Sequence, residues 1–333
     1  MNQPELLTAL GPLARLYEDT TAMVIMVDAP DKVYIHREGE LVDTDVRFAD
    51  AAAFQETINA LLTLGHHPTT PQHPIAELRL PDGARMMIVL PPTAVAGPHL
   101  VIHKYPGASM TWEMLVSWGS ITQPTLDLLL EAIRGRTNIL IAGGTNAGKT
   151  TIANLMAGSI PATQRIILVE ATYEMRVQHP RCLALEAGNP AGIVMTELLD
   201  AAARMSPDWL IIGELTGPEA LHALEVVSRG VNGMMTIHAD SAEDALVRLE
   251  TMCLMANMGL GLGQIRQLIA SAVRLVTYQE MVVERGRRRR VLTQIVELRG
   301  VENDRYILQP LFRYNPDTQT TEATGHQTTF LAT

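Results

Sequence analysis

The sequence has few cysteines, no surplus of basic side chains and no long apolar run. Its two cysteines, Cys182 and Cys253, exclude a disulfide framework and a tetrahedral thiolate metal site, so we expect small buried thiols in a reducing compartment. The formal net charge of −10 argues against a protein whose main task is to grip a nucleic-acid backbone, because that task needs a basic face. We therefore expect no nucleic-acid partner.

Signals for membrane targeting are also lacking. Residues 1–5 carry no basic region followed by an apolar stretch, so we expect no signal peptide. No apolar run approaches the roughly 18 residues that a membrane-spanning helix needs. These absences favour a cytoplasmic chain.

The 333 residues contain 47% hydrophobic and 19% charged side chains, the composition of an ordinary globular protein. At about 100–200 residues per domain, this length favours two domains. Residues 1–104 are predicted to form a small α/β domain, because a helical pattern lies among short strand patterns. The predicted helices span 6–17, with an interruption at Gly11-Pro12, and 50–64. The predicted strands span 22–27, 33–36, 76–80, 86–90 and 99–104.

Residues 105–120 are predicted to be a linker that bends at Gly107 and Gly119. From 121 to 314, helical patterns alternate with short continuous apolar runs, which indicates a central sheet covered by helices on both faces. The chain becomes strand-like again after Tyr278, with a hairpin at about 285–287, and the Thr- and Gln-rich residues 315–333 are predicted to be disordered. The apolar runs are 139–141, 166–169, 210–212 and 234–237.

A phosphate-binding loop is the strongest local signal. Its eight residues fit the pattern G-x-x-x-x-G-K-[ST], and an apolar strand precedes it while a helix follows from Thr151. Glycines let backbone N–H groups converge on phosphate oxygens, and the helix N-terminus adds partial positive charge. Such a loop predicts ATP and Mg²⁺ as ligands, with the lysine on the β- and γ-phosphates and the last threonine on the metal. The loop consists of Gly143, Gly144, Thr145, Asn146, Ala147, Gly148, Lys149 and Thr150.

Polar side chains follow three other predicted strands. Glu214 ends the strand at 210–212, Glu170 and Glu174 follow the strand at 166–169, and His238 ends the strand at 234–237. In an open α/β sheet the carboxyl ends of the strands form the ligand crevice, so these side chains are expected near the phosphates. A histidine at such a strand end is a candidate sensor of the γ-phosphate.

Four segments together resemble the motif boxes of the type II/IV secretion ATPase superfamily, which powers secretion systems, conjugation machines and type IV-like pili. The N-terminal segment at 78–105 also resembles the N-terminal domain of that family, so the likeness covers about residues 8–314. Within the superfamily the sequence is most similar to the CpaF/TadA-like ATPases of tight-adherence (Flp) pili, with the conjugation ATPase TrbB as the rival. The four segments are the phosphate loop, VEATYE at 169–174, RMSPDWLIIGE at 204–214 and TIHADSAEDALVRLETM at 236–252.

The resemblance implies a RecA-like phosphate-loop core with a smaller N-terminal α/β domain of PAS-like type. It also implies a homo-hexamer that lies at the inner face of the cytoplasmic membrane, holds ATP between its domains and drives an inner-membrane platform protein. Matched position by position, Lys149, Thr150 and Glu214 become the phosphate, Mg²⁺ and Walker B residues.

The remaining matches concern the γ-phosphate. Glu174 matches the water-activating glutamate, and Glu170 matches the first acid of the same box and is a candidate for the metal. His238 is the histidine of the fourth box. Arg85 matches an arginine of the N-terminal domain that approaches the phosphates and can stabilise charge in the transition state.

Three positions depart from the family pattern. Ala171 stands where an aspartate is usual, and His103 and Thr216 stand where arginines are usual. An arginine finger contributes about 10³–10⁵ in rate, so these losses permit a second reading, an ATP-binding scaffold that hydrolyses weakly. A third reading, a phosphate-loop kinase for a small molecule, is disfavoured because no segment resembles an acceptor-binding lid.

One basic cluster spans Arg287 to Arg290. We interpret it as a solvated hairpin turn. The functional alternative is a contact with anionic lipid head groups or with an acidic loop of the platform protein.

Overall fold

The computed structural model describes residues 3–37, 40–66, 73–104, 110–188, 192–284 and 287–330, and for Glu284 and Arg287 it describes the backbone alone. The chain divides into two compact units, Met1–Ser109 and Met110–Thr333. No helix in the described ranges is both long enough and apolar enough to cross a membrane. Gly107, one of the two predicted hinge residues, lies outside the described residues.

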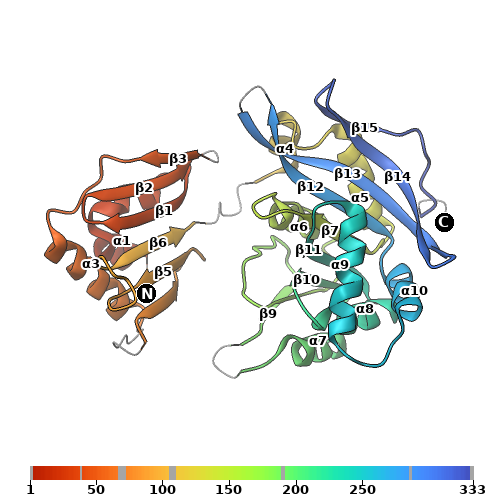
Figure 1. The fold of residues 1–333 in the computed structure, drawn as a ribbon, viewed down its shortest axis with the longest axis horizontal. Coiled ribbons are helices and arrows are strands. Elements are labelled where there is room, and N and C mark those ends of the chain that lie inside the picture. The colour runs from red at the N-terminus through yellow and green to blue at the C-terminus, as the bar shows by residue number, and fades with distance from the viewer. Residues whose placement is uncertain are drawn as a thin grey trace. The chain divides into compact units, whose positions relative to one another are not determined.

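The first unit contains a six-stranded antiparallel sheet with the strand order β3-β2-β1-β6-β5-β4 (Figure 1, red to orange). Five strands and both helical segments lie where the sequence predicts them, and the first segment is interrupted at Gly11–Leu13 as expected, whereas β3 was not predicted. The strands are β1 (Ala22–Ala29), β2 (Lys32–Arg37), β3 (Glu40–Asp43), β4 (Ile75–Arg79), β5 (Arg85–Val89) and β6 (His99–His103). The helices are α1 (Gln3–Leu10), η1 (Gly11–Leu13), α2 (Ala14–Glu18) and α3 (Ala51–Leu64).

The core of this unit lies between the helices and one face of the sheet. Along β4 and β5 every second residue is buried, so one face packs and the other does not. Leu10 and Leu61 of the helices pack with Ile25 and Met86 of the strands in one buried cluster. The helix α3 starts where the Asp50 carboxylate accepts a hydrogen bond from the Ala53 N–H at 2.8 Å.

The second unit contains a nine-stranded sheet with the order β15-β14-β13-β12-β7-β11-β10-β8-β9. The six strands from β12 to β9 in this order are parallel, and β13, β14 and β15 continue the sheet as an antiparallel meander. The strands are β7 (Ile139–Gly143), β8 (Ile166–Glu170), β9 (Cys182–Glu186), β10 (Trp209–Leu215), β11 (Asn232–His238), β12 (Leu275–Glu284), β13 (Arg287–Glu302), β14 (Arg305–Asn315) and β15 (Thr320–Ala323).

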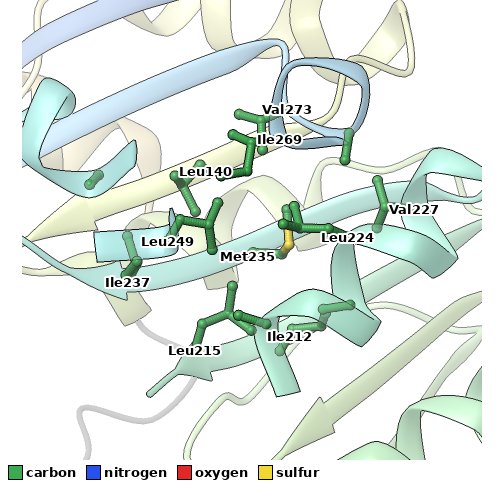
Figure 2. Close-up of a cluster of buried hydrophobic side chains, with 14 of the residues drawn as sticks. Leu140, Ile212, Leu215, Leu224, Val227, Met235, Ile237, Leu249, Ile269 and Val273 are labelled. Atoms are coloured by element: carbon green, nitrogen blue, oxygen red, sulfur yellow. The ribbon is translucent and has the colours of Figure 1, made fainter. Parts of the chain in front are cut away.

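Helices cover both faces of the parallel part, as the apolar runs predict. Leu140 of β7 packs on one face with residues of α7, α8, α9 and α10, a cluster shown in Figure 2. Ile139 and Ile141 of the same strand pack on the other face with residues of α4, α5 and α6. The helices are α4 (Trp112–Ser117), α5 (Gln123–Arg134), α6 (Lys149–Gly158), α7 (Met195–Arg204), α8 (Glu219–Ser228), α9 (Ala242–Met255) and α10 (Leu262–Ala272).

Residues 315–330 pack onto the second unit, which corrects the prediction of a disordered tail over 315–333 for the part that the structure describes. Thr320–Ala323 forms β15 and pairs with β14, and the Thr329 N–H donates to the buried Glu297 carboxylate at 3.2 Å. Arg274 pairs with the same carboxylate at 3.0 Å. The polar composition suggested disorder, yet the Thr321 hydroxyl donates to the Leu292 carbonyl and the Thr329 hydroxyl donates to Glu297, and both acceptors belong to β13.

The segment after residue 109 belongs to the second unit, where the sequence predicts a linker up to 120. It contains α4, and the Trp112 indole N–H donates to the Ser159 hydroxyl at 3.0 Å. The Gly119 carbonyl accepts a hydrogen bond from the Arg289 guanidinium at 2.6 Å. Gly119 is therefore held against β13, and this does not support its predicted role as a hinge.

Candidate nucleotide site

The phosphate loop joins β7 to α6 as the sequence predicts. β7 ends at Gly143 and α6 begins at Lys149, so Lys149, Thr150 and Thr151 form its first turn. The first N–H groups of a helix have no acceptor within the helix and carry partial positive charge. This end of α6 can therefore bind an anion.

Glycine is required or tolerated at the three loop positions for different structural reasons. Gly148 has φ 100°, a left-handed conformation that side chains rarely adopt. A Cβ on Gly143 would lie 2.5 Å from the Gln279 carbonyl oxygen of β12, so the adjacent strand excludes any side chain there. A Cβ on Gly144, in contrast, would meet no described atom within 4 Å. Gly144 faces open space, where a ligand has room to approach the backbone.

Lys149 lies over the loop that it follows. Its Nζ donates to the carbonyl oxygens of Gly143 and Gly144, each at 3.1 Å, and lies 3.8 Å from Glu214 Oε1. The side chain is only 11% exposed, and burial lowers the pKa of its ammonium group, while the charges of Glu214 and Glu174 oppose that shift. The structure thus brings the predicted lysine and two predicted glutamates together.

Glu214 lies within a local irregularity of β10. The pairing of β10 with β11 shifts register between Ile212 and Leu215, and the Thr236 hydroxyl of β11 donates to the Gly213 carbonyl. The Glu214 side chain is 47% exposed, so its carboxylate can meet a cation in solvent.

Glu170 is buried beneath the loop that carries Glu174. The residue is 4% exposed, and its carboxylate accepts backbone N–H bonds from Glu174 at 3.1 Å and from Met175 at 3.2 Å. Burial raises the pKa of Glu170 to about 7, although these two N–H bonds work against the shift. A Cβ on Gly213 would lie 2.5 Å from the Glu170 Cγ, so the glycine before Glu214 makes room for this carboxyl group.

His238 is the last residue of β11 and pairs directly with Gly143. The Ala239 N–H donates to the Gly143 carbonyl at 3.3 Å, which continues the contact past the strand end. His238 therefore lies beside the first residue of the phosphate loop, as the sequence predicts.

Two of the departures from the family pattern lie near these residues. Thr216 is held by the carboxylate of Glu219, which accepts bonds from the Thr216 N–H at 2.8 Å and from its hydroxyl at 3.3 Å. Ala171 is exposed at the start of the loop after β8. Thr216 thus closes the turn into α8 and adds no positive charge there.

Arg85 and His103 belong to the first unit. They are cross-strand partners at the ends of β5 and β6, so they lie side by side. The Arg85 side chain is mostly buried, and its Nε lies 3.9 Å from Glu77 Oε1. The structure does not place this unit relative to the phosphate loop, so the role predicted for Arg85 stays a prediction.

The interpretation of the basic cluster Arg287–Arg290 as a solvated turn is wrong at two of its four positions, Arg289 and Arg290. Arg289 donates to the carbonyl oxygens of Gly119 at 2.6 Å and Gln319 at 2.9 Å, and Arg290 Nε donates to the Asn146 carbonyl of the phosphate loop at 2.8 Å. Arg288 is exposed. No motif or spacing links Arg290 to a loop 144 positions away, so this contact could not be predicted from the sequence.

The donors at the site suit Mg²⁺ together with phosphate. The Thr150 hydroxyl and the Glu214 carboxylate supply oxygen ligands, which this ion prefers. Among the described residues no group of three or more His, Cys, Asp or Glu side chains could hold a metal ion. A cation here would take further ligands from a nucleotide and from water, as Mg²⁺ commonly does.

Comparisons with known proteins agree with this architecture. A putative conjugal transfer protein of Mycobacterium tuberculosis is 29% identical over 308 residues, which cover 89% of this chain and 86% of that protein. The type IV secretion system protein PtlH of Bordetella pertussis is 32% identical over 257 residues, which cover 67% of this chain and 74% of PtlH.

The fold recurs in a solved structure, that of the ATPase DotB from Yersinia pseudotuberculosis. The TM-score is 0.64 at 15% identity, over 89% of this chain and 80% of that one. The predicted fold is confirmed, with an N-terminal domain and a RecA-like ATPase domain. The sequence matches the family described as "Type II/IV secretion system protein" over residues 7–312, and the chain belongs to that family.

Proposed function

We propose that this protein hydrolyses ATP as a subunit of a motor that powers a conjugation, secretion or pilus machine. One observation carries the proposal: Lys149 of the phosphate loop lies 3.8 Å from the exposed Glu214, and burial lowers the pKa of Lys149 while the negative charge of Glu174 opposes that shift. A cation, a metal-ligating acid and a candidate base then surround the position that a γ-phosphate would occupy beyond the loop.

Each residue has a separate task in this proposal. In the presence of ATP, Lys149 would exchange its bonds to the loop carbonyls for bonds to the β- and γ-phosphates. Thr150 and Glu214 would hold Mg²⁺, and this ion would neutralise charge that develops on the phosphates. Glu174 orients and deprotonates the attacking water. His238 is placed to report on the terminal phosphate.

Glu170 has a positioning role in this scheme. Because both of its oxygens already accept backbone N–H bonds of the Glu174 loop, it holds Glu174 in place and does not contact the metal directly. Its burial beneath that loop supports this assignment.

The proposal also includes the first unit of the chain and a ring of subunits. Arg85 of the first unit, with His103 beside it, would complete the charge around the γ-phosphate, and a homo-hexamer would bring neighbouring subunits to each site. ATP would lie between the two domains, and the ring would act at the inner face of the cytoplasmic membrane on a platform protein. The four motif boxes favour a tight-adherence (Flp) pilus machine. The likeness to a conjugal transfer protein and to PtlH equally permits conjugation or type IV secretion.

The test is Mg²⁺-dependent ATP turnover measured against protein concentration. Lys149→Ala is expected to abolish ATP binding, and Glu174→Gln to keep binding but lower turnover by about 10²–10⁴, the usual contribution of a general base. Glu131→Gln on the exposed side of α5 is the matched control and leaves both unchanged. Turnover per subunit that rises as subunits associate would support a ring. Tight binding with turnover no faster than that of Glu174→Gln would favour the weakly hydrolysing scaffold that Ala171 and Thr216 permit.

A further inference from the structure

The hairpin of β12 and β13 touches the phosphate loop on the side away from Glu214. β7 has β11 on one side and β12 on the other, and Gly143 pairs with His238 of β11 and with Gln279 of β12. Two side chains of this hairpin, Gln279 and Arg290, reach the loop. The functions described above use neither of them.

Gln279 is a buried polar group without a complete set of partners. The residue is 3% exposed, and its Nε2 has no hydrogen-bond partner within the described part of the chain. Its Oε1 lies 3.4 Å from the point that a Cβ on Gly148 would occupy, so the amide packs against the start of α6. Buried donors are almost always satisfied in native proteins, and an exception requires an explanation, such as a ligand that is absent.

Arg290 is a cation at the apex of the same loop. Its Nε donates to the Asn146 carbonyl at 2.8 Å, and its Cδ lies 3.5 Å from the Cβ position of Gly148. Asn146 has φ 60°, so the bond supports a left-handed turn at the apex. The residue is exposed, and none of the ion pairs between described residues includes it. In a chain of net charge −10, a guanidinium that keeps free N–H groups beside an anion-binding loop is a candidate anion ligand.

The geometry also indicates which part of the nucleotide the hairpin would meet. Lys149 and Glu214 define the side of the terminal phosphate, because the metal and the attacking water belong there. The hairpin flanks β7 on the opposite side. It therefore faces the phosphates nearer to the nucleoside.

We propose, on the basis of the nucleotide site assigned above, that the β12–β13 hairpin forms the second wall of that site. Arg290 binds the α- and β-phosphates and fixes the loop apex through Asn146. Gln279 is a positioning residue, whose amide N–H gains an acceptor when the loop closes on the diphosphate. The hairpin thus contributes to affinity for ATP and ADP alike, whereas Glu174 contributes to turnover.

The first experiment measures the affinity of the full chain for fluorescent ATP and ADP analogues. Arg290→Gln keeps a donor for Asn146 but loses the charge, and it is expected to weaken both nucleotides about tenfold or more, as loss of a charge-assisted bond does. Arg290→Lys keeps most of the affinity because it keeps the charge. Arg288→Gln, two positions away on the same strand, is the control and matches the wild type.

Salt dependence separates a phosphate contact from a merely structural role. The Arg290→Gln protein is expected to show a smaller decrease in affinity with rising salt than the wild type, because it has lost one charge that faces the phosphates. Affinities equal to those of Arg288→Gln, or a loss confined to ATP, would overturn the assignment of Arg290.

Gln279 is tested against a second buried, unpartnered group on the same strand, the Thr277 hydroxyl. Gln279→Leu is expected to raise the melting temperature of the free protein and to weaken ADP severalfold, because it removes an unsatisfied donor that nucleotide would satisfy. Thr277→Val is expected to raise the melting temperature and to leave ADP affinity unchanged. Equal ADP affinities of the two variants would overturn the role of Gln279.

Lys149→Ala distinguishes the two proposals. If it abolishes nucleotide binding while Arg290→Gln binds like Arg288→Gln, the nucleotide site stands and the hairpin wall is wrong. If the wild-type chain binds neither nucleotide, both proposals are wrong.

Discussion

The two sides of β7 present different chemistry to the phosphate loop. Toward β11, β10 and β8, the strand ends bring His238, Glu214 and the loop of Glu174. Glu214 lies 3.8 Å from the Lys149 ammonium group, and burial lowers the pKa of that group while the charges of both acids oppose the shift. Toward β12 and β13, the loop meets the amide of Gln279 and the guanidinium of Arg290. Carboxylates lie on one side of the loop, and hydrogen-bond donors lie on the other.

Nucleotide binding and ATP hydrolysis are therefore assigned to different sides of the loop. Carboxylates suit a metal ion and an attacking water, which act at the terminal phosphate. Amide and guanidinium donors suit the phosphate oxygens of any nucleotide, because binding these oxygens requires positive charge and hydrogen bonds but no chemical reaction. Substitutions on the two sides should therefore change different measurements.

The largest effect is expected from Gly213→Ala on the acidic side. The new Cβ would lie 2.5 Å from Glu170 Cγ and 2.6 Å from its Oε1, so the buried carboxyl group must move and the loop of Glu174 must follow. Overpacking of this kind costs about 1–3 kcal/mol of the free energy of unfolding. Urea unfolding, followed by the fluorescence of buried Trp209 in the same strand, measures that cost.

The matched control is Gly261→Ala, whose Cβ would approach no atom closer than 3.7 Å. ATP turnover is expected to fall with Gly213→Ala and to stay unchanged with the control. Unchanged stability and turnover in both variants would show that Glu170 does not support the loop of Glu174.

A smaller effect separates the ligand-facing glycine of the loop from the hairpin-facing one. Gly148→Ala is expected to lower the free energy of unfolding by about 1–2 kcal/mol, because φ 100° is strained for alanine. Gly144→Ala is expected to change it by less than about 0.5 kcal/mol, the usual range for a substitution that meets no other group.

Gly144→Ala is expected to change nucleotide affinity, although it hardly changes stability. Its Cβ would enter the open space where a phosphate would approach, so Gly144→Ala should weaken ATP binding measurably at nearly wild-type stability. Chemical denaturation and titration with a fluorescent nucleotide measure the two quantities. Wild-type affinity of Gly144→Ala would place the phosphates elsewhere on the loop.

The smallest effect concerns the pH dependence of stability on the acidic side. Burial raises the pKa of Glu170 to about 7 in the folded chain, from 4.5 in the unfolded one. The folded state therefore binds more protons between these values, and stability decreases as the pH rises through the folded pKa. Between pH 6 and pH 8 this one group should remove about 1 kcal/mol.

Glu170→Gln removes that titration and should flatten the corresponding part of the pH profile. Unfolding free energies of both proteins at pH 6 and pH 8 give the comparison. Equal slopes in the variant and the wild type would mean that Glu170 titrates normally in the folded protein.

Most elements could be predicted from the sequence because their residues are buried in regular patterns. The strands β7, β8, β10 and β11 are apolar on both faces, and the phosphate loop has a fixed spacing. The three strands that were missed are β3, β9 and β15. Each lies at a sheet edge and is largely exposed, so backbone pairing to one neighbour defines it and no apolar pattern reveals it.

The candidate site divides in the same way. Lys149, Glu214, Glu174 and His238 were predicted because each follows a recognisable strand, and the carboxyl ends of parallel strands meet at one edge. The roles of Glu170 and Gly213 were not readable, since they depend on how closely β8 and β10 approach. Composition alone gave the wrong answer for the C-terminal tail.

The phosphate loop, the parallel sheet and the family can be recognised in the amino-acid sequence, because they follow from local spacing and from burial on two faces. Which side chains meet across long distances in the chain depends on the tertiary structure. Arg290 reaches Asn146 because β13 pairs with β12 and β12 pairs with β7. Such pairings depend on the packing of the whole sheet, and no local pattern encodes them.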